Sequence, residues 1–308
     1  MKFTVLGSGA GLPSKDRNTQ SFVIDCVLEY NEYILIDAGE GLQHRILHTH
    51  IKPSKIKNIF ITHLHGDHIF GLPGFLSSRA FQGGEGIPLK IYGPKGLVEW
   101  LQTTFRISES TLNYPLEIVE VEPYMNLRLN NFDVHVHPLS HGIESYAYIF
   151  KEDDKVGELQ TDKLRELGLK PGPVYGEIKS SDTFTVDGTV YNTSDFIGDT
   201  IKGRKITVHG DTRLNSDDEY LKLINDSDLI VHEATFLKEE KEKAHDYFHS
   251  EINQVLDVFK NINYSALMFV HISNRYTDED IKEVNAGLNN RAVIAYDYFE
   301  LPIPRNVL

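Results

Sequence analysis

Cysteine, tryptophan and long apolar runs are scarce in this sequence. Its 308 residues include one cysteine, Cys26, and one tryptophan. A single cysteine excludes an intrachain disulfide and a zinc site built from cysteine thiolates. No stretch approaches the ~20 apolar residues that a membrane-spanning helix needs. The first residues lack the apolar core and cleavage site of a signal peptide, so we expect a cytoplasmic protein.

Basic residues are also few. The chain has 31 Lys and Arg against 45 Asp and Glu, which gives a formal net charge of −14. The general attraction of a basic protein for nucleic acid is therefore absent, and a nucleic-acid partner would need a local patch or a metal site. The composition, 40% hydrophobic and 25% charged, is that of a globular protein with a large core, not of a disordered chain.

Short apolar runs alternate with amphipathic helical patterns through both halves of the chain. The runs at 3–6, 58–61, 205–208 and 267–270 have strand length, and the patterns at 39–48, 95–105 and 252–259 have helical spacing. This alternation predicts a layered α/β fold.

One segment, 151–187, interrupts the alternation. It is charged and contains Pro171-Gly172-Pro173, which cannot lie inside a central strand or helix. About 35 residues is long for a connecting loop, and loops of that length are usually functional or disordered. We therefore expect an arm inserted into the main domain.

The sequence His63-Leu64-His65-Gly66-Asp67-His68 follows an apolar strand and supplies four metal-binding side chains within six residues. Positions i and i+2 of an extended chain point the same way, so His63 and His65 can converge on one ion. Gly66 permits a turn after which Asp67 and His68 can face a second ion. Imidazole with carboxylate suits zinc better than manganese or iron.

Three further candidate ligands follow apolar strands elsewhere in the chain: His141, Asp211 and His271. Ligand sites of α/β proteins gather beyond the ends of strands, which agrees with this placement. A carboxylate can bind two cations, one through each oxygen, and Asp211 is the candidate for that bridge.

The H-x-H-x-D-H run resembles the metallo-β-lactamase superfamily, and four other motifs narrow the resemblance to the ribonuclease Z family in its short bacterial form. These motifs are Pro13-Ser14-Lys15-Asp16-Arg17-Asn18, His232-Glu233-Ala234-Thr235, His271-Ile272-Ser273-Asn274-Arg275-Tyr276 and Pro171-Gly172-Pro173. The resemblance runs from end to end. It implies a four-layer αββα sandwich over residues 1–308, with 151–187 as an inserted flexible arm that binds the tRNA elbow.

The resemblance also implies the ligand sets and the reaction. His63, His65 and His141 would hold one Zn²⁺, Asp67, His68 and His271 the other, and Asp211 would bridge them. The family's enzymes remove the 3′ trailer from precursor tRNA, which leaves a 3′-hydroxyl on the tRNA and a 5′-phosphate on the trailer. A homodimer is implied as well.

Roles beyond the metal ligands follow from the same comparison. Asp67 would orient the attacking water as a base, and His249, held by Glu233, would protonate the leaving 3′ oxygen. The family commonly has His-Ser-Thr where this chain has His249-Ser250-Glu251, so packing around that helix can differ. The candidate substrate-binding residues are Lys15, Arg17, Ser273, Arg275, Pro171, Gly172 and Pro173, and arginine forks suit phosphate oxygens.

Three other functions remain open on sequence. The same ligands would serve a dizinc phosphodiesterase for small phosphodiesters or general RNA. A tRNA-binding scaffold with a retired metal site would not hold two zinc ions. A β-lactam or thioester hydrolase is possible because the fold does not fix the function, although the motif set argues against it.

Overall fold

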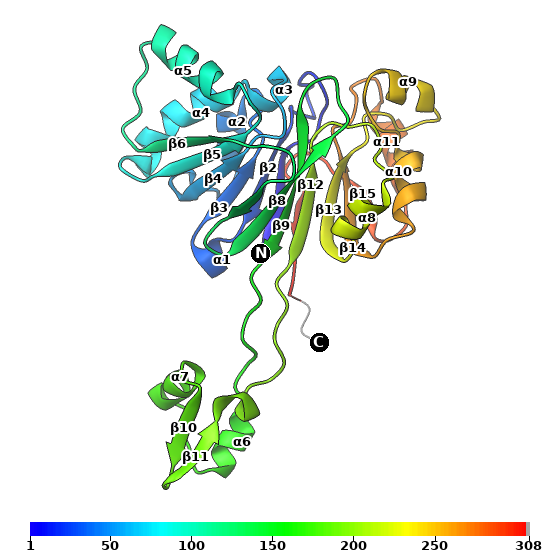
Figure 1. Ribbon diagram of the computed structural model, residues 1–308. Helices are drawn as coiled ribbons and strands as arrows, with labels where there is room; N and C mark the ends of the chain where they lie inside the picture. The colour runs from blue at the N-terminus through cyan, green and yellow to red at the C-terminus, as the bar shows by residue number, and fades with distance from the viewer. Residues whose placement is uncertain (306–308) are drawn as a thin grey trace. The chain divides into compact units, whose positions relative to one another are not determined.

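The computed structural model describes residues 1–305, which divide into two compact units (Figure 1). Unit 1 comprises residues 1–151 and 205–304, and unit 2 comprises residues 152–204 together with Arg305. Each unit has its own hydrophobic core.

Unit 1 contains two seven-stranded sheets. The first has the order β16-β1-β2-β3-β4-β5-β6, and the second has the order β15-β14-β13-β12-β9-β8-β7. Strands of the first sheet are β1 (Lys2–Gly7), β2 (Ser21–Asp25), β3 (Tyr33–Ile36), β4 (Ile56–Phe60), β5 (Leu89–Gly93), β6 (Leu116–Glu120) and β16 (Glu300–Pro302). Strands of the second are β7 (Asn126–Arg128), β8 (Phe132–Leu139), β9 (Ser145–Glu152), β12 (Lys205–His209), β13 (Ser227–Glu233), β14 (Tyr264–Val270) and β15 (Ala292–Ile294).

The core between the two sheets is built from alternate residues of their strands. Val134 and Val136 of β8 face inward, while the intervening positions of that strand are less buried, as a period of two requires. Phe60 of β4 packs on Tyr148 and Phe150 of β9, with ring centroids 5.0 Å apart in each pair. The Tyr148 hydroxyl donates to the Ile61 carbonyl at 2.7 Å, which satisfies a buried polar group and ties the sheets together.

Helices cover the outer faces of both sheets, and each outer face has its own apolar cluster. The first sheet is accompanied by α1 (Val27–Tyr30), α2 (Leu42–Leu47), η1 (Pro53–Lys55), α3 (Gly66–Ile69), α4 (Leu72–Arg79), η2 (Ala80–Gly84) and α5 (Leu97–Ile107). The second is accompanied by α8 (Asp218–Ile224), α9 (Lys241–Asp246), α10 (Ile252–Phe259) and α11 (Asp278–Gly287). Ile252, Val255 and Phe259 show the pattern: they recur at helical spacing along α10 and are buried.

The predicted α/β sandwich with helices outside two sheets is therefore confirmed. None of the helices found in residues 1–305 has the length and apolar character required to cross a membrane.

Unit 2 has a small core around Leu164, Ile178 and Phe196. Its elements are α6 (Thr161–Glu166), α7 (Pro173–Lys179), β10 (Thr183–Val186), β11 (Thr189–Asn192) and η3 (Thr193–Phe196). β10 and β11 form a hairpin whose turn, Asp187-Gly188, has φ values of 47° and 80°. Glycine accepts such a left-handed conformation without strain.

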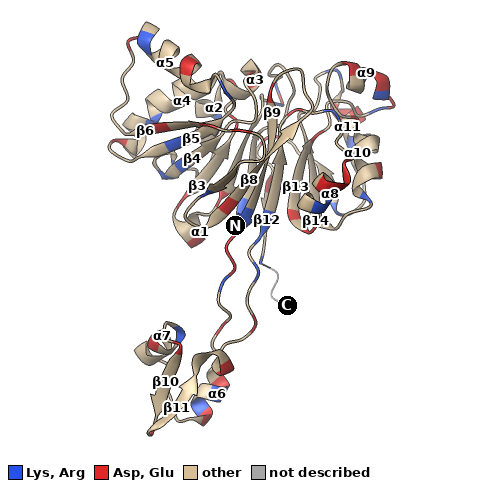
Figure 2. Cartoon of the chain, viewed as in Figure 1, with Lys and Arg blue, Asp and Glu red and all other residues tan. Residues whose placement is uncertain are grey.

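The segment predicted as an arm, 151–187, covers most of unit 2, which continues to Arg204. The unit has its own secondary structure, and α7 begins at Pro173, where the fixed φ of proline suits the first turn of a helix. Both α6 and α7 carry residues of both charge signs (Figure 2). At the base of the unit, the buried Glu152 carboxylate pairs with Arg204 at 2.7 Å and with Arg305 at 2.5 Å.

Candidate active site

The seven predicted metal ligands lie together at the ends of strands of unit 1. His63, His65, Asp67 and His68 follow β4, whereas His141, Asp211 and His271 follow β8, β12 and β14. Their ligand atoms form overlapping groups in which all atoms lie within 4.8 Å of one another. The groups are His63, His65, His141 and Asp211; then Asp67, His68 and His271; then Asp211, His249 and His271.

Several histidines of the cluster are hydrogen-bonded through Nδ1, which leaves the lone pair of Nε2 free to face the centre of the cluster. His68 Nδ1 donates to Asp37 Oδ2 at 2.8 Å, and His141 Nδ1 donates to the Phe248 carbonyl at 2.9 Å. A proton on Nδ1 leaves Nε2 without one, which is the form that binds a metal.

Two threonine hydroxyls accept a hydrogen bond from the Nδ1 atom of two further histidines. Thr62 Oγ1 donates to Asp37 at 2.8 Å and so accepts from His63 Nδ1 at 3.1 Å. Thr235 Oγ1 donates to Glu233 at 2.8 Å and so accepts from His271 Nδ1 at 2.9 Å. Both hydroxyl hydrogens point to a carboxylate, so the tautomers of the two rings are fixed.

Unpaired buried atoms mark the centre of the cluster. Within residues 1–305, His63 Nε2, His68 Nε2 and Asp211 Oδ1 are buried and have no hydrogen-bond partner. A buried polar atom without a partner is costly unless an ion or a water satisfies it. Five imidazoles and two carboxylates form a donor set that suits zinc. The residues therefore fit a metal site.

Asp211 occupies the position between the ligand groups. Its Oδ2 lies 3.6 Å from His63 Nε2 and 3.2 Å from His271 Nε2, while its Oδ1 lies 3.6 Å from His68 Nε2. The preceding Gly210 allows this approach, because a Cβ there would lie 2.7 Å from Thr62 Cβ. Burial opposes ionisation of Asp211, but the surrounding histidines hold its pKa well below the usual range.

The buried Glu233 and the half-buried His249 form a pair beside this cluster. His249 Nδ1 donates to Glu233 Oε1 at 2.9 Å. Glu233 also accepts from the backbone amides of Thr212 and Ser250 at 3.1 Å each, so the carboxylate is held from several sides. Burial alone would lower the pKa of His249, but the Glu233 carboxylate raises it to about 9.

Asp67 is held by the loop that contains the P-x-K-x-R-N sequence. The Gly11 amide donates to Asp67 Oδ2 at 2.9 Å, and His271 Nε2 lies 3.3 Å from the same oxygen. Burial would raise the pKa of Asp67, but His68 and His271 lower it. The carboxylate is therefore both ionised and oriented.

The same loop is fixed by a buried carboxylate, Asp297. Its Oδ1 accepts from the Ser8 amide at 2.9 Å and the Ser8 hydroxyl at 2.7 Å, and its Oδ2 accepts from the Asn18 amide at 2.7 Å and from Arg45 at 2.5 Å. The Arg17 guanidinium points into this network, where it donates to Ser8 Oγ at 2.7 Å and to the Ala295 carbonyl at 2.6 Å.

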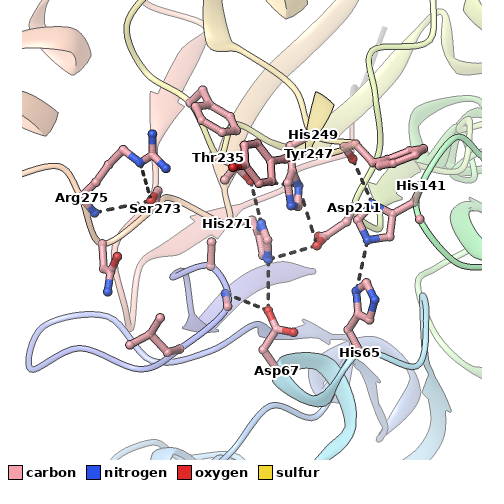
Figure 3. Close-up of a pocket in the computed structure, with 17 residues that line it drawn as sticks. His65, Asp67, His141, Asp211, Thr235, Tyr247, His249, His271, Ser273 and Arg275 are labelled. Atoms are coloured by element: carbon pink, nitrogen blue, oxygen red, sulfur yellow. Dashed lines mark hydrogen bonds and ion pairs between the residues drawn. The ribbon is translucent and has the colours of Figure 1, made fainter. Parts of the chain in front are cut away.

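A pocket of about 370 Å³ opens above the cluster (Figure 3). Ser273 and Arg275 line it, and Arg275 Nε donates to Ser273 Oγ at 3.2 Å. Lys15 is exposed on its loop and is not part of the pocket lining, whereas Pro171, Gly172 and Pro173 lie in unit 2.

Sequence reasoning missed the residues that orient the ligands: Asp37, Thr62, Thr235, Gly11 and Asp297. A signal existed for Asp37, since it directly follows the apolar strand β3 as Asp211 follows β12. Thr235 belongs to the motif His232-Glu233-Ala234-Thr235, but the motif alone does not indicate what its hydroxyl contacts. The positions of Gly11 and Asp297 depend on contacts across 56 and 289 residues of chain, which no local pattern signals.

Comparison with known proteins places this arrangement in a family. Proteins named ribonuclease Z are similar to the chain: that of Staphylococcus saprophyticus is 43% identical over 290 residues, 94% of each chain. The protein of Staphylococcus aureus is 44% identical over 284 residues, 92% of each chain. The chain belongs to the ribonuclease Z family. Its residues 1–163 also match the family model described as "Anti-Pycsar protein Apyc1", a stretch that ends before Asp211 and His271.

One solved structure agrees with the ribonuclease Z assignment, and a second shares the fold. Human tRNase Z, short form, is 26% identical, with a TM-score of 0.72 and coverage of 99% of this chain and 100% of the human chain. The metallo-beta-lactamase fold protein YhfI from Bacillus subtilis shares 15% identity, with a TM-score of 0.67 and coverage of 97% and 98%. The second likeness concerns the fold alone.

Proposed function

We propose that this protein is a metal-dependent endoribonuclease that removes the 3′ trailer from precursor tRNA, a function that its relatives named ribonuclease Z support. The observation that carries the proposal is the convergence of seven metal-binding side chains with the hydrogen-bonded Glu233–His249 pair. Such a combination supplies what hydrolysis of a phosphodiester needs: charge neutralisation, a nucleophile and a proton donor.

Two zinc ions would be held by the residues of the cluster: His63, His65 and His141 for one, Asp67, His68 and His271 for the other, with Asp211 between them. When bound, the ions supply a nucleophile at neutral pH and positive charge beside the phosphoryl oxygens. The three unpaired buried atoms in the cluster support this assignment.

The chain's own residues would handle the protons. Asp67, oriented by the Gly11 amide, accepts a proton from the water that attacks phosphorus. As the bond from phosphorus to the 3′ oxygen breaks, His249 gives its Nε2 proton to that oxygen, and Glu233 keeps the imidazole oriented through Nδ1. The products are a tRNA with a 3′-hydroxyl and a trailer with a 5′-phosphate.

Substrate binding would divide between the two units. Arg275 and Ser273 line the pocket and are suited to phosphate oxygens. Lys15 would act on the RNA backbone outside the pocket, whereas the part-buried hydrogen bonds of Arg17 to Ser8 and Ala295 give it a role in holding the loop. Pro171, Gly172 and Pro173 in unit 2 would contact folded tRNA, which proteins recognise by shape and backbone. A homodimer and a cytoplasmic location remain predictions.

Cleavage of a precursor tRNA tests the proposal. The substrate lacks an encoded CCA end and carries a 3′ trailer, and the purified protein is assayed with and without a chelator. We expect a chelator-sensitive cut directly after the discriminator nucleotide, mapped at single-nucleotide resolution. Absence of that cut in a protein that holds two zinc ions would refute the tRNA assignment.

A dizinc phosphodiesterase for small substrates is the second candidate. All seven ligands and the catalytic pair lie in unit 1, and residues 1–163 match a family with another name. Hydrolysis of a small chromogenic phosphodiester without cleavage of precursor tRNA would favour this function.

A further inference from the structure

Tyr247 lies two residues before His249, the candidate proton donor, and has no role in the proposed reaction. Tyr247 and His249 both line the pocket, and Figure 3 draws them on the same wall. Tyr247 is 66% exposed, so it is not packed into the core.

A sharp turn after α9 places these side chains together. Phe248, between them, has φ = 61°, a left-handed conformation that is strained for a bulky residue. The turn closes through two backbone hydrogen bonds, from Phe248 N to the His245 carbonyl at 3.2 Å and from His249 N to the Ala244 carbonyl at 2.8 Å. Strain of this kind persists only where surrounding contacts impose it.

Those contacts involve Phe248 and leave the Tyr247 ring open to solvent. The Arg213 guanidinium covers the Phe248 ring at 3.8 Å from its centroid, and Arg213 Nε donates to the His245 carbonyl at 2.6 Å. The Phe248 carbonyl accepts from His141 Nδ1. Phe248 therefore holds the turn and is half-buried, although it also lines the pocket, whereas Tyr247 is the more exposed of these two aromatic residues.

The proposed reaction determines which nucleotide of the RNA lies next to His249. In the proposed function, on which this inference rests, His249 protonates the 3′ oxygen that leaves, and that oxygen belongs to the last nucleotide of the tRNA. Tyr247 is two residues from His249 on the same turn. The base of that nucleotide is single-stranded, and proteins bind such bases by stacking them on aromatic side chains.

We propose that Tyr247 is the stacking platform for the base immediately 5′ of the scissile phosphate. Stacking needs only the flat face that every base has, so the platform accepts any discriminator base without reading its edge. Tyr247 is a positioning residue: it holds the last nucleotide of the tRNA so that the 3′ oxygen of that nucleotide lies at His249.

The test combines protein variants with modified substrates. Tyr247→Ala removes the ring, Tyr247→Leu keeps bulk without aromaticity, and Tyr247→Phe keeps the ring without the hydroxyl. Tyr124→Ala, at another 62% exposed tyrosine of unit 1 that is outside the pocket lining, is the control. The precursor tRNAs carry either a normal or an abasic nucleotide 5′ of the cut, and a third is abasic 3′ of the cut.

We expect Tyr247→Ala and Tyr247→Leu to lower kcat/KM about 10-fold or more on the normal substrate, the scale of one base stacked on an aromatic ring. Tyr247→Phe and Tyr124→Ala should match the unmodified protein. The abasic 5′ nucleotide should lower kcat/KM of the unmodified protein to a similar extent, and Tyr247→Ala should then cause little further loss. Zinc content and Tm verify that each variant is folded.

Three results would overturn the inference. Equal losses by Tyr247→Ala on normal and abasic 5′ substrates would mean that the ring does not meet that base. If Tyr247→Ala instead caused little further loss only on the substrate that is abasic 3′ of the cut, the ring would stack on the first base of the trailer. A Tyr247→Phe variant as poor as Tyr247→Ala would assign the effect to the hydroxyl. Failure of the proposed function looks different, because the unmodified protein would then leave every precursor uncut.

Discussion

Removal of the Asp297 carboxylate tests whether the loop at residues 8–18 positions Asp67, the proposed catalytic carboxylate. In Asp297→Ala, the backbone amides of Ser8 and Asn18 lose their acceptor at a site where Asp297 is 8% exposed. Each unpaired buried donor costs about 1–3 kcal/mol. Arg45, whose side chain is 22% exposed, can regain water and adds less. The free energy of unfolding should fall by about 2–5 kcal/mol, and Tm by roughly 4–10 °C.

The loss of activity should exceed what partial unfolding explains. Loosening residues 8–18 weakens the hydrogen bond from Gly11 to Asp67, and a hydrogen bond to a charged group contributes about 1.5–3 kcal/mol. Loss of roughly 1.4 kcal/mol of that in the transition state lowers kcat/KM about tenfold. The assay is precursor tRNA cleavage well below the Tm of the variant, with urea unfolding in parallel. Asp133→Ala, at a 69% exposed carboxylate paired with Arg128, is the control.

A folded Asp297→Ala protein with lowered Tm and unchanged kcat/KM would refute the reasoning. The network would then stabilise the fold without orienting Asp67. Equal losses in the control would point to a general effect of charge removal.

Three further predictions follow from the site, the inserted unit and the outer core. Glu233→Gln should lower kcat by at least about 100-fold with little change in KM, because His249 loses its anionic partner, as steady-state cleavage rates would reveal. Replacing residues 156–200 by a short Gly/Ser linker should abolish precursor tRNA cleavage and spare a small phosphodiester. The pKa of His137 is lowered to about 4, mainly by burial and to a smaller extent by the neighbouring His135. Between about pH 6.5 and 4 the unfolded chain therefore binds a proton at this residue that the folded chain does not bind. The free energy of unfolding falls as the pH drops through that window. His137→Phe should reduce that fall by about 1 kcal/mol, after allowance for partial exposure, in urea unfolding at pH 7 and pH 5.

Controls separate these effects from misfolding. Glu251→Gln changes a buried carboxylate that caps α10 and should lower stability with less effect on kcat than Glu233→Gln. The linker design keeps the paired backbone hydrogen bonds between Lys155 and Ile201, at 2.8 and 2.9 Å, and leaves the paired strands β9 and β12 unchanged. Equal loss of both activities would contradict a tRNA-binding role for unit 2. An exposed histidine, His48, serves as the control for His137, and an unchanged pH profile in His137→Phe would show that other groups cause the acid sensitivity.

Much of the fold and of the ligand cluster follows from local sequence rules. Alternation along an extended chain brings His63 and His65 to the same side, and ligands after apolar strands meet where those strands end. His141, Asp211 and His271 could be found in this way although β8, β12 and β14 are far apart in the chain.

The orienting contacts could not be predicted because they depend on tertiary packing. Arg17 lies in a polar loop, and such an arginine is expected to contact substrate, yet its guanidinium turns inward to Ser8 and Ala295. Asp297 follows no recognisable motif and acquires its partners only after the ends of the chain come together. Local patterns carry no information about such pairs.

The hairpin of unit 2 is a case in which a local signal was present. Asp187-Gly188 joins two runs of alternating residues, a common turn sequence for a two-residue hairpin. The predicted arm ends at Asp187, the first of these two residues, because its boundary follows composition and proline content, which do not detect a short β pair.

The assembly of the metal ligands from distant segments links the lifetime of the protein to the supply of metal. Residues from position 63 to position 271 meet only in the folded chain, so an unfolded chain offers no comparable site. A cation present at 1,000 times its dissociation constant stabilises such a fold by about 4 kcal/mol through mass action alone. In a cell short of that cation, the population of chains open to proteases would rise accordingly, and degradation would deplete the protein as the metal became scarce.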